Sequence, residues 1–372
     1  MRIGVPKEIK LQEYRIGLTP ESVKVLTGKG HEVLVENNGG FEAGFTNEDY
    51  KNAGAKIIDK AADIFKDSDL IVKVKEPQSS EVKMIRENQI IYTYLHLAAA
   101  KELTEGLIKS KSVCIAYETV TDDNGRLPLL APMSAVAGRM SVQAGAHSLE
   151  KTQKGRGLLL GGAPGVDSAT VVILGGGVVG ENAALIATGM RANVFIVDKS
   201  PERLKQLQEI FGDKIKPIQS EKADLKKLVA DCDLLIGGVL IPGAEAPKLV
   251  TRDMVKSMKR GSVIVDVAID QGGCIETSRP TTHDNPTYLV NDVVHYCVAN
   301  MPGGVPRTST IALNKVTLPL LVKIADQGYE KALKENKNYL AGLNVFKGVV
   351  TCKGVADSFK LKYTPPNEAL EN

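Results

Sequence analysis

The chain of 372 residues is long for one domain and comfortable for two. Its 47 Lys and Arg residues against 44 Asp and Glu residues leave a formal net charge of +3, which is too small to indicate a nucleic-acid partner. The 5 cysteines are scattered and odd in number, which argues against a disulfide framework and against a zinc site. No apolar run reaches the roughly 18 residues of a membrane span. We therefore expect a cytoplasmic protein with no membrane partner and no metal.

The first third of the chain alternates short apolar runs with helical patterns. The apolar runs predict strands at residues 2–5, 32–36, 70–74, 90–95 and 113–117. A helix is predicted from Pro20 to about Thr27, because Thr19 is a good N-cap and proline fits the first helical position. Strands that alternate with helices in this way predict a parallel α/β sheet.

A second α/β series follows a long helix of small residues, which is predicted from Pro132 to about Lys151. Its strands are predicted at residues 170–174, 193–197, 232–237, 262–268 and 288–291. The Pro- and Gly-rich stretch 301–306 then interrupts the chain, and the tail beyond it is predicted to hold two helices, with Pro319 bending the first. A tail this short cannot form its own core, so we expect it to pack on the first α/β unit.

The strongest local pattern lies at the start of the second series. An apolar strand runs into Gly175, Gly177 and Gly180 with the spacing G-x-G-x-x-G, and an alanine-rich helix follows. Gly175 allows a tight turn, Gly177 lets a pyrophosphate approach the backbone, and Gly180 lets the helix pack close to the sheet. The unpaired N–H groups at the helix N-terminus favour an anion. Three glycines alone are a weak signal, but together with this strand and helix they predict a dinucleotide-binding site.

An acidic residue at the end of the next strand indicates which dinucleotide is used. Asp198 lies 18 residues after Gly180. A carboxylate at this place accepts hydrogen bonds from the ribose hydroxyls and repels a 2′-phosphate, so the pattern favours NAD over NADP. Lys199 and Arg203 follow closely, which leaves some use of NADP open.

Four polar side chains are expected at the carboxyl ends of strands, where open α/β sheets bind their ligands. Arg15 lies in the loop after the first strand, Lys75 follows the third predicted strand, and His96 follows the fourth. In the second series, the strand at 262–268 leads to Asp270. If the rim of the first unit faces the nicotinamide end of the cofactor, two cations, an imidazole and a carboxylate converge on one site.

This set of groups suits the interconversion of a 2-amino acid and a 2-oxo acid. Arg15 can hold a carboxylate bidentately, and Lys75 can polarise a carbonyl oxygen or bind the other carboxylate oxygen. His96 can exchange a proton near neutrality, and Asp270 can orient the water or ammonia that attacks an imine carbon. Each also has a structural interpretation, such as a solvated arginine, a lysine at a sheet edge or an acid that starts a turn. The prediction depends on the coincidence of all four.

Several longer motifs resemble the alanine dehydrogenase family over essentially the whole chain. They are MRIGVPKE at 1–8, RIGLTP at 15–20, VKVKEP at 72–77, YLHLA at 94–98, PMS at 132–134, the glycine loop, VAIDQGG at 267–273 and VANMP at 298–302. The resemblance implies an α/β fold of two Rossmann-like domains with parallel sheets, and a homohexamer. The catalytic domain, discontinuous in sequence, would comprise residues 1–130 plus 305–372, and the NAD-binding domain residues 131–304.

The resemblance also implies an activity, namely the reversible oxidative deamination of L-alanine with NAD and water to pyruvate, ammonium and NADH, as used in L-alanine catabolism. By motif match, Arg15 and Lys75 would bind the substrate, while His96 and Asp270 would form the acid–base pair. The residues that would contact NAD, several of them through the backbone, are Ser134, Gly175, Gly177, Val178, Val179, Gly180, Asp198, Arg203, Ser220, Val239, Leu240, Val267, Ala268, Ile269, Asp270, Arg279, Val298, Ala299, Asn300 and Met301.

Two other functions remain open at this point. The NAD-binding part of membrane transhydrogenases resembles this chain in MRIGVPKE and in the glycine loop, and would make it a binding module that docks on a partner. That relative lacks the histidine of YLHLA, so His96 favours the enzyme. The second alternative is a related reductase that joins an amino acid to a 2-oxo acid. It would need a roomier pocket, which the sequence does not measure.

Overall fold

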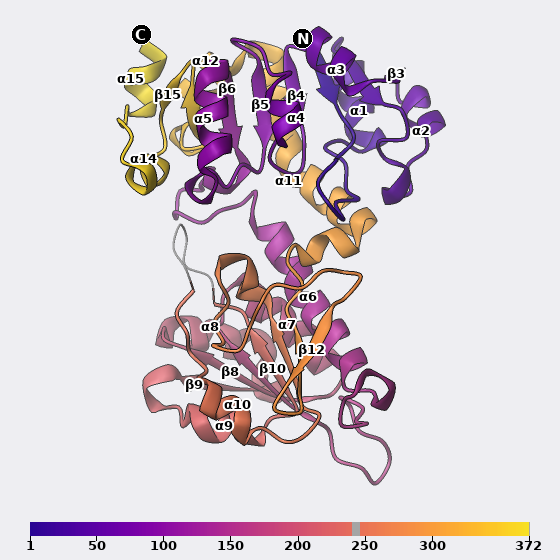
Figure 1. Ribbon diagram of the computed structural model, residues 1–372, viewed down its shortest axis with the longest axis vertical. Helices are drawn as coiled ribbons and strands as arrows, with labels where there is room; N and C mark the ends of the chain where they lie inside the picture. Colours follow the sequence, from indigo (N-terminus) through magenta and orange to yellow (C-terminus); the bar gives the residue numbers. More distant parts are fainter. Residues whose placement is uncertain (240–245, 372) are drawn as a thin grey trace. The chain divides into compact units, whose positions relative to one another are not determined.

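The computed structural model describes residues 1–239 and 246–371, and it divides into two units (Figure 1). The first unit joins Met1–Met133 to the segment from Gly303 onward, and the second unit is Ser134–Pro302. Each unit has its own mostly parallel sheet, with helices packed against it. Within the described ranges, no helix combines the length and the apolar character needed to cross a bilayer.

The first unit is built on an 8-stranded sheet with the strand order β15-β14-β6-β5-β4-β1-β2-β3. β1 to β6 are parallel, and their order is that of a doubly wound dinucleotide-binding sheet. β14 and β15 extend the sheet beyond β6 and run antiparallel. The strands are β1 (Arg2–Val5), β2 (Glu32–Glu36), β3 (Lys56–Ile58), β4 (Leu70–Val72), β5 (Ile90–Thr93), β6 (Val113–Ala116), β14 (Leu343–Phe346) and β15 (Val349–Val350). The helices are α1 (Pro20–Gly28), α2 (Asn47–Asn52), α3 (Ala61–Asp67), α4 (Ser79–Val82), α5 (Lys101–Ser110), α11 (Pro306–Gln327), α12 (Tyr329–Lys334), α13 (Lys337–Leu340), α14 (Lys353–Phe359) and α15 (Pro366–Glu371).

The central strands of this sheet are apolar on both faces, as expected for parallel strands with helices on each side. In β5, Ile91 belongs to a buried cluster that includes Leu107 of α5. The neighbouring Tyr92 points to the opposite face, where its hydroxyl donates a hydrogen bond of 3.0 Å to the carbonyl oxygen of Thr317 in α11. α5 and α11 therefore cover opposite faces of the sheet (Figure 1).

The tail beyond residue 303 holds more structure than the two helices that its sequence predicts. α11 continues through Pro319 as one helix, and α12, α13, β14, β15, α14 and α15 follow it. β14 pairs with β6, with Phe346 opposite Val113, so the tail extends the first sheet. The prediction of two helices is wrong because it overlooks these short strands, whose stability comes from pairing with a distant part of the chain.

The second unit has a 7-stranded sheet with the order β12-β13-β11-β10-β7-β8-β9. All of its strands except β12 are parallel, and β9-β8-β7-β10-β11-β13 repeats the doubly wound order of the first sheet. The strands are β7 (Thr170–Leu174), β8 (Asn193–Asp198), β9 (Ile215–Gln219), β10 (Leu234–Gly237), β11 (Val263–Asp266), β12 (Thr287–Val290) and β13 (Val293–Tyr296). The helices are α6 (Ala131–Ser148), which begins in the first unit, α7 (Val178–Gly189), α8 (Pro201–Phe211), α9 (Leu225–Asp231) and α10 (Arg252–Ser257).

Several strands that the sequence does not predict lie at sheet edges. β3 and β9 are edge strands. Pro217 lies inside β9, and because proline cannot donate a hydrogen bond to a neighbouring strand, its presence argues against a strand in the sequence. β12 and β13 form a hairpin where a single strand is predicted, and Asn291 and Asp292 between them both have positive φ, as a tight hairpin turn requires. The predicted fold class, two Rossmann-like α/β units, is confirmed, with antiparallel strands added at three places.

Candidate active site

The glycine loop after β7 has the backbone that a dinucleotide site requires. Gly175 has a φ of +94°, a conformation that L side chains rarely adopt. A Cβ on Gly180 would lie 1.9 Å from the carbonyl oxygen of Gly175, so glycine alone lets α7 start this close to the strand. A Cβ on Gly177, the N-cap of α7, would meet no atom of the described residues within 4 Å. The loop is closed on its inner side and open at the helix N-terminus, where an anion would bind.

Asp198 and Arg203 hold the middle residue of this loop from two sides. At the end of β8, the Asp198 carboxylate accepts hydrogen bonds of 2.6 Å from the N–H of Gly176 and 2.8 Å from the N–H of Ser200. Nε of Arg203 donates a hydrogen bond of 2.7 Å to the carbonyl oxygen of Gly176. Nη2 of Arg203 pairs with the carboxylate of Glu181 in the first turn of α7. The loop is thus fixed by a carboxylate and a guanidinium from the strand and helix that follow it.

The other predicted cofactor contacts follow the carboxyl ends of the remaining parallel strands. Ser220 comes directly after β9, Val239 shortly after β10, residues 267–270 after β11, and residues 298–301 after β13. Because parallel strands share one carboxyl edge, these segments start at the same edge of the sheet as the glycine loop. This is the edge where doubly wound sheets bind ligands.

Some of the predicted cofactor residues have side chains that are occupied elsewhere. Val298 and Met301 are 0% and 3% exposed and belong to the core of the second unit, so a ligand could touch only their backbone. The guanidinium of Arg279 lies over the ring of Tyr288, 4.1 Å from its centroid. Ser134 lies within α6, and Leu240 lies outside the described residues.

Two acidic residues near the end of β11 have different surroundings. Asp270 is exposed, and its two carboxylate oxygens accept hydrogen bonds of 3.1 Å and 3.4 Å from the backbone N–H of Asn300. Asp266 is buried and accepts the backbone N–H groups of Cys274 and Ile275. Burial raises the pKa of Asp266. Asp266 therefore stabilises the local turn, whereas Asp270 is the acid that is accessible for chemistry.

In the first unit, the Arg15 side chain is buried and held by an acid. Nε and Nη2 donate hydrogen bonds of 2.7 Å and 2.5 Å to the two carboxylate oxygens of Glu13, and Nη1 lies 3.0 Å from Sδ of Met133. Burial alone would lower the pKa of Arg15, but the Glu13 carboxylate outweighs it and the pKa is raised. Glu13 thus occupies the side of the guanidinium formed by Nε and Nη2.

Lys73 and Lys75 follow β4 but lie in different environments. Lys73 is fully buried, with its ammonium 3.0 Å from Glu8 and 2.8 Å from Glu81. Lys75 is partly exposed, and the Glu8 carboxylate accepts the backbone N–H groups of Val74 and Lys75 at 2.6 Å and 3.4 Å. β4 lies inside the sheet, so the alternative that these lysines guard a sheet edge is wrong. Lys73 holds this loop together, and Lys75 stays the candidate for substrate binding.

His96 lies after β5 in a left-handed backbone conformation, with φ of +49°, and its side chain is 47% exposed. Glu118, which follows β6, accepts the backbone N–H groups of His96 at 2.6 Å and Leu95 at 3.1 Å. One oxygen of Glu118 also lies 4.0 Å from Nδ1 of His96. The imidazole stacks on Tyr94, with 5.8 Å between the ring centroids. The sequence does not single out Glu118, because no motif links residues 22 positions apart.

Arg15, Lys75 and His96 follow β1, β4 and β5, which are parallel neighbours in the first sheet. They therefore belong to loops that start at one carboxyl edge. The hydroxyl of Thr93 donates a hydrogen bond of 3.0 Å to the carbonyl oxygen of Lys75, which ties two of these loops together. The fourth candidate, Asp270, belongs to the second unit.

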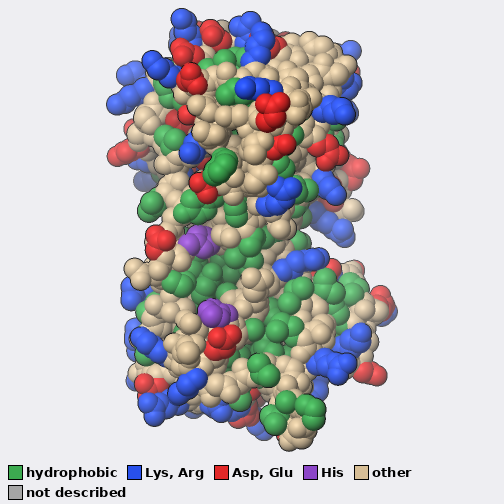
Figure 2. All heavy atoms as spheres, turned by 90° about the vertical axis from the view of Figure 1, so that its right-hand side faces the viewer, with side chains coloured by type: hydrophobic (Ala, Val, Ile, Leu, Met, Phe, Trp, Pro, Cys, Tyr) green, Lys and Arg blue, Asp and Glu red, His purple; other side chains and the backbone are tan. Residues whose placement is uncertain are grey.

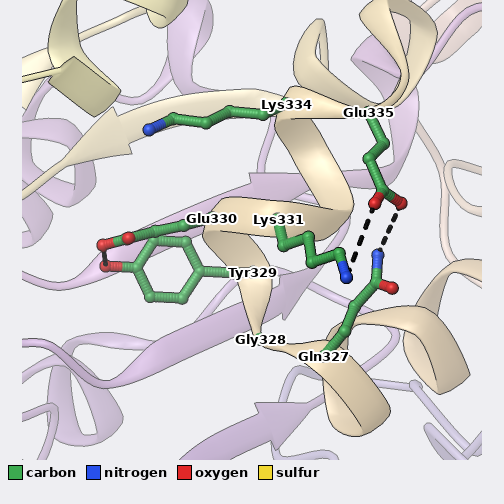
Figure 3. Close-up of a pocket in the computed structure, with 7 residues that line it drawn as sticks. All are labelled: Gln327, Gly328, Tyr329, Glu330, Lys331, Lys334 and Glu335. Carbon is green, nitrogen blue, oxygen red and sulfur yellow. Dashed lines mark hydrogen bonds and ion pairs between the residues drawn. The ribbon is translucent and has the colours of Figure 1, made fainter.

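Two surface pockets are lined by other residues. One is lined by Gln327, Tyr329, Lys334 and their neighbours, which are mostly polar or charged (Figure 3). Asp326 next to it pairs with Lys29 and His31, which precede β2, so this pocket lies at the amino-terminal edge of the first sheet. Figure 2 shows cationic and anionic side chains interspersed on the visible face of the first unit. Among the described residues, no group of three or more His, Cys, Asp and Glu side chains could hold a metal ion.

Two doubly wound sheets, one with a glycine fingerprint and an acid at the end of its next strand, define a protein of the two-domain Rossmann class. Residues 4–137 match the family model described as alanine dehydrogenase/PNT, N-terminal domain, and residues 141–353 match alanine dehydrogenase/PNT, C-terminal domain. The chain therefore belongs to the alanine dehydrogenase/PNT family, and the resemblance predicted from its motifs is confirmed.

Relatives match the chain along its whole length. It is 56% identical over 363 residues to the alanine dehydrogenase of Halomonas elongata, covering 98% of each chain, and 53% identical over 372 residues to that of Staphylococcus epidermidis, covering 100% of each. A solved L-alanine dehydrogenase superposes with a TM-score of 0.94 at 52% identity, covering 97% of this chain and 99% of that one. A transhydrogenase from Sinorhizobium meliloti gives a TM-score of 0.83 at 24% identity, covering 94% of this chain and 100% of that one, which shows a shared fold alone.

Proposed function

We propose that the chain is an NAD-dependent alanine dehydrogenase, which reversibly converts L-alanine, NAD and water to pyruvate, ammonium and NADH. The observation that carries this proposal is the match to relatives named alanine dehydrogenase, at 53% to 56% identity over essentially the whole of both chains. The arrangement of polar groups at the carboxyl edges of both sheets supports it.

The residues at the carboxyl edge of the second sheet fit NAD. The N-terminus of α7 suits a pyrophosphate, because a Cβ at Gly177 would meet none of the described residues within 4 Å. Asp198 ends β8, and an acid at that place binds ribose hydroxyls in this fold. When bound, NAD would supply the hydride acceptor for oxidation of the substrate. The chain itself contributes the loop, the carboxylate and the surrounding backbone that hold the dinucleotide in place.

Arg15 and Lys75 are the proposed substrate-binding residues. Arg15 carries a fixed positive charge, because Glu13 raises its pKa and orients its guanidinium. It would bind the substrate carboxylate through its guanidinium. Lys75 would bind the other carboxylate oxygen or polarise the carbonyl oxygen of pyruvate. The adjacent buried Lys73 pairs with acids and is left out of this role.

His96 and Asp270 are the proposed acid–base residues. The imidazole of His96 is half exposed, and Glu118 holds its backbone N–H, so the ring would serve as the general acid or base toward a bound substrate. Asp270 is exposed and anchored by the N–H of Asn300, and its carboxylate would orient the attacking water or offset positive charge on the substrate nitrogen. These two roles can be tested one residue at a time.

The alternative of a transhydrogenase-type binding module has less support, because that comparison rests on 24% identity and therefore on the fold alone. A reductase that joins an amino acid to a 2-oxo acid stays possible on chemistry. We further propose a homohexamer in the cytoplasm: all 5 cysteines are free thiols, which fits a reducing compartment. Light scattering would test the hexamer by measuring six times the mass of the chain.

The deciding assay is NADH formation by the purified protein across a panel of L-amino acids, with NADP in a parallel series. Turnover with alanine and NAD is expected, with much less turnover with NADP. Pyruvate plus ammonium should be reduced in the reverse direction. Reduction that requires an added amino acid in place of ammonium would favour the reductase, and NADH binding without turnover on any amino acid would favour the binding module.

A further inference from the structure

Arg203 in the first turns of α8 has every nitrogen of its guanidinium engaged by a partner. Nε donates to the carbonyl oxygen of Gly176 at 2.7 Å, Nη1 donates to Gln206 at 3.1 Å, and Nη2 pairs with the Glu181 carboxylate. The side chains of Arg203 and Glu181 are 26% and 36% exposed, so the pair is partly accessible to solvent.

This ion pair lies beside the carboxylate of Asp198, which is expected to bind the ribose hydroxyls. Gly176 connects the two groups, because its N–H bonds to Asp198 and its carbonyl oxygen bonds to Arg203. In dinucleotide-binding folds, an acid at the end of the second strand binds the ribose 2′-OH, and NADP-binding members use a nearby arginine for the 2′-phosphate. Arg203 is therefore an arginine in the right neighbourhood for a 2′-phosphate, yet its guanidinium is already bound to an acid.

We infer that Glu181 is a specificity-determining residue, which holds Arg203 on the glycine loop and so withholds it from a 2′-phosphate. The inference rests on the proposed use of NAD. Selectivity for NAD over NADP then has two sources. Asp198 repels the additional phosphate, and Glu181 engages Arg203, one of the two nearby cations that could compensate.

The charge balance of the loop supports this role. Glu181 lies in the first turn of α7, at the end of the helix where the pyrophosphate is expected. An acid there repels an anionic ligand unless a cation offsets it, and Arg203 provides that offset. The charges of the pair cancel, so the pair neither attracts nor repels NAD strongly. The additional phosphate of NADP would meet a guanidinium whose charge is already balanced by Glu181. A purely structural ion pair between α7 and α8 would affect stability without affecting this discrimination.

The test is a double-mutant cycle read by fluorescence titration with NADH and NADPH, using Glu181→Gln, Arg203→Gln and the double variant. The readout is the ratio of the Kd for NADPH to the Kd for NADH. Glu181→Gln should lower this ratio about tenfold, equivalent to about 1.4 kcal/mol, because Arg203 becomes available to the 2′-phosphate. Glu202→Gln is the matched control, since it removes an exposed acid from the first turn of α8.

The cycle separates the possible results. A fall in the ratio that requires Arg203, and that is absent in Glu202→Gln, supports the inference. An unchanged Kd ratio in Glu181→Gln overturns it. The inference is also overturned if Glu181→Gln lowers the ratio equally in the wild type and in Arg203→Gln, because Glu181 would then act by its own charge alone. Wild-type protein that binds neither dinucleotide would overturn the proposed function and this inference together. NADH binding without the expected shift would overturn the inference only.

Discussion

Replacing Gly177 by alanine should weaken dinucleotide binding while leaving the fold intact. Its φ of −67° is open to any L residue, and an added Cβ meets no atom within 4 Å in the part of the chain that the structure describes. As the N-cap of α7, alanine in place of glycine costs up to about 1 kcal/mol of stability. The methyl group would, however, stand on the open side of the loop, where the pyrophosphate must approach. We expect the Kd for NADH to rise at least about tenfold, equivalent to about 1.4 kcal/mol.

Gly180→Ala is the counterpart that should act on the fold first. Its Cβ would lie 1.9 Å from the carbonyl oxygen of Gly175, and because that atom is backbone, α7 has to move away from β7. Overpacking of this kind costs about 3 kcal/mol or more. For a domain of this size, the midpoint of thermal unfolding should fall by roughly 6–12 °C.

Both variants, together with Gly189→Ala, are to be measured by NADH fluorescence titration and by thermal unfolding on the same samples. Gly189 lies in the last turn of α7, where a Cβ also meets no atom within 4 Å. Alanine there should keep the Kd for NADH and add up to about 1 kcal/mol of helix stability. NADH binding by Gly177→Ala that equals the wild type would refute the placement of the pyrophosphate at this loop. An unchanged unfolding midpoint in Gly180→Ala would refute the reasoning on close packing.

Four further changes test the chemistry and the core. His96→Ala should lower kcat about a hundredfold or more with the Kd for NADH retained, and an unchanged kcat would remove His96 from the mechanism. Arg15→Lys should raise the KM for pyruvate about tenfold, because lysine cannot both keep the paired contact with Glu13 and bind a second carboxylate. An unaltered KM would argue against binding of the substrate carboxylate by Arg15. Asp198→Asn should relax the preference for NAD while keeping a side-chain oxygen as acceptor for the loop, and an undiminished preference would mean that the ribose is read elsewhere. Burial lowers the pKa of His295 to about 4, so between pH 4 and about 6.5 the unfolded chain binds more protons than the folded one, and stability falls as the pH falls. The free energy of unfolding, measured in urea, should therefore drop between pH 7.5 and pH 5 by about 2 kcal/mol more in the wild type than in His295→Gln. An equal drop in the two proteins would contradict this.

The parts of the fold that the sequence predicts are those whose signal is local. The alternation of buried strands with helices is visible in the residue pattern, and so is the N-cap at Thr19, whose side chain accepts the N–H of Ser22. The strands that escape prediction lie at or next to a sheet edge, and their stability comes from pairing with a distant part of the chain. β9 contains Pro217, and β14 contains the polar Asn344, so neither has the pattern of a buried strand.

The candidate site follows the same division. The glycine loop and the acid at the end of β8 are recognisable from spacing, because the fold requires those residue types at those places. The partners that orient the site come from separate elements. Glu118 reaches the loop of His96 from the end of β6, and Glu181 reaches Arg203 across the glycine loop. Glu13 is near its partner Arg15 in the sequence, but a side-chain pair two positions apart in a loop has no characteristic spacing.

The carboxyl edges of the two sheets carry different kinds of polar groups. The second sheet presents backbone N–H groups and a helix N-terminus, which suit an anion that every dinucleotide carries. The first sheet presents cations that are buried with acids, as in the pairs of Arg15 with Glu13 and of Lys73 with Glu8 and Glu81. Buried ion pairs add little net stability compared with apolar packing, although removal of one partner costs several kcal/mol. Their value at this edge is therefore positional. Glu13 keeps Arg15 charged and fixed, as the proposed role in binding a substrate carboxylate requires, and the Lys73 cluster fixes the loop that carries Lys75.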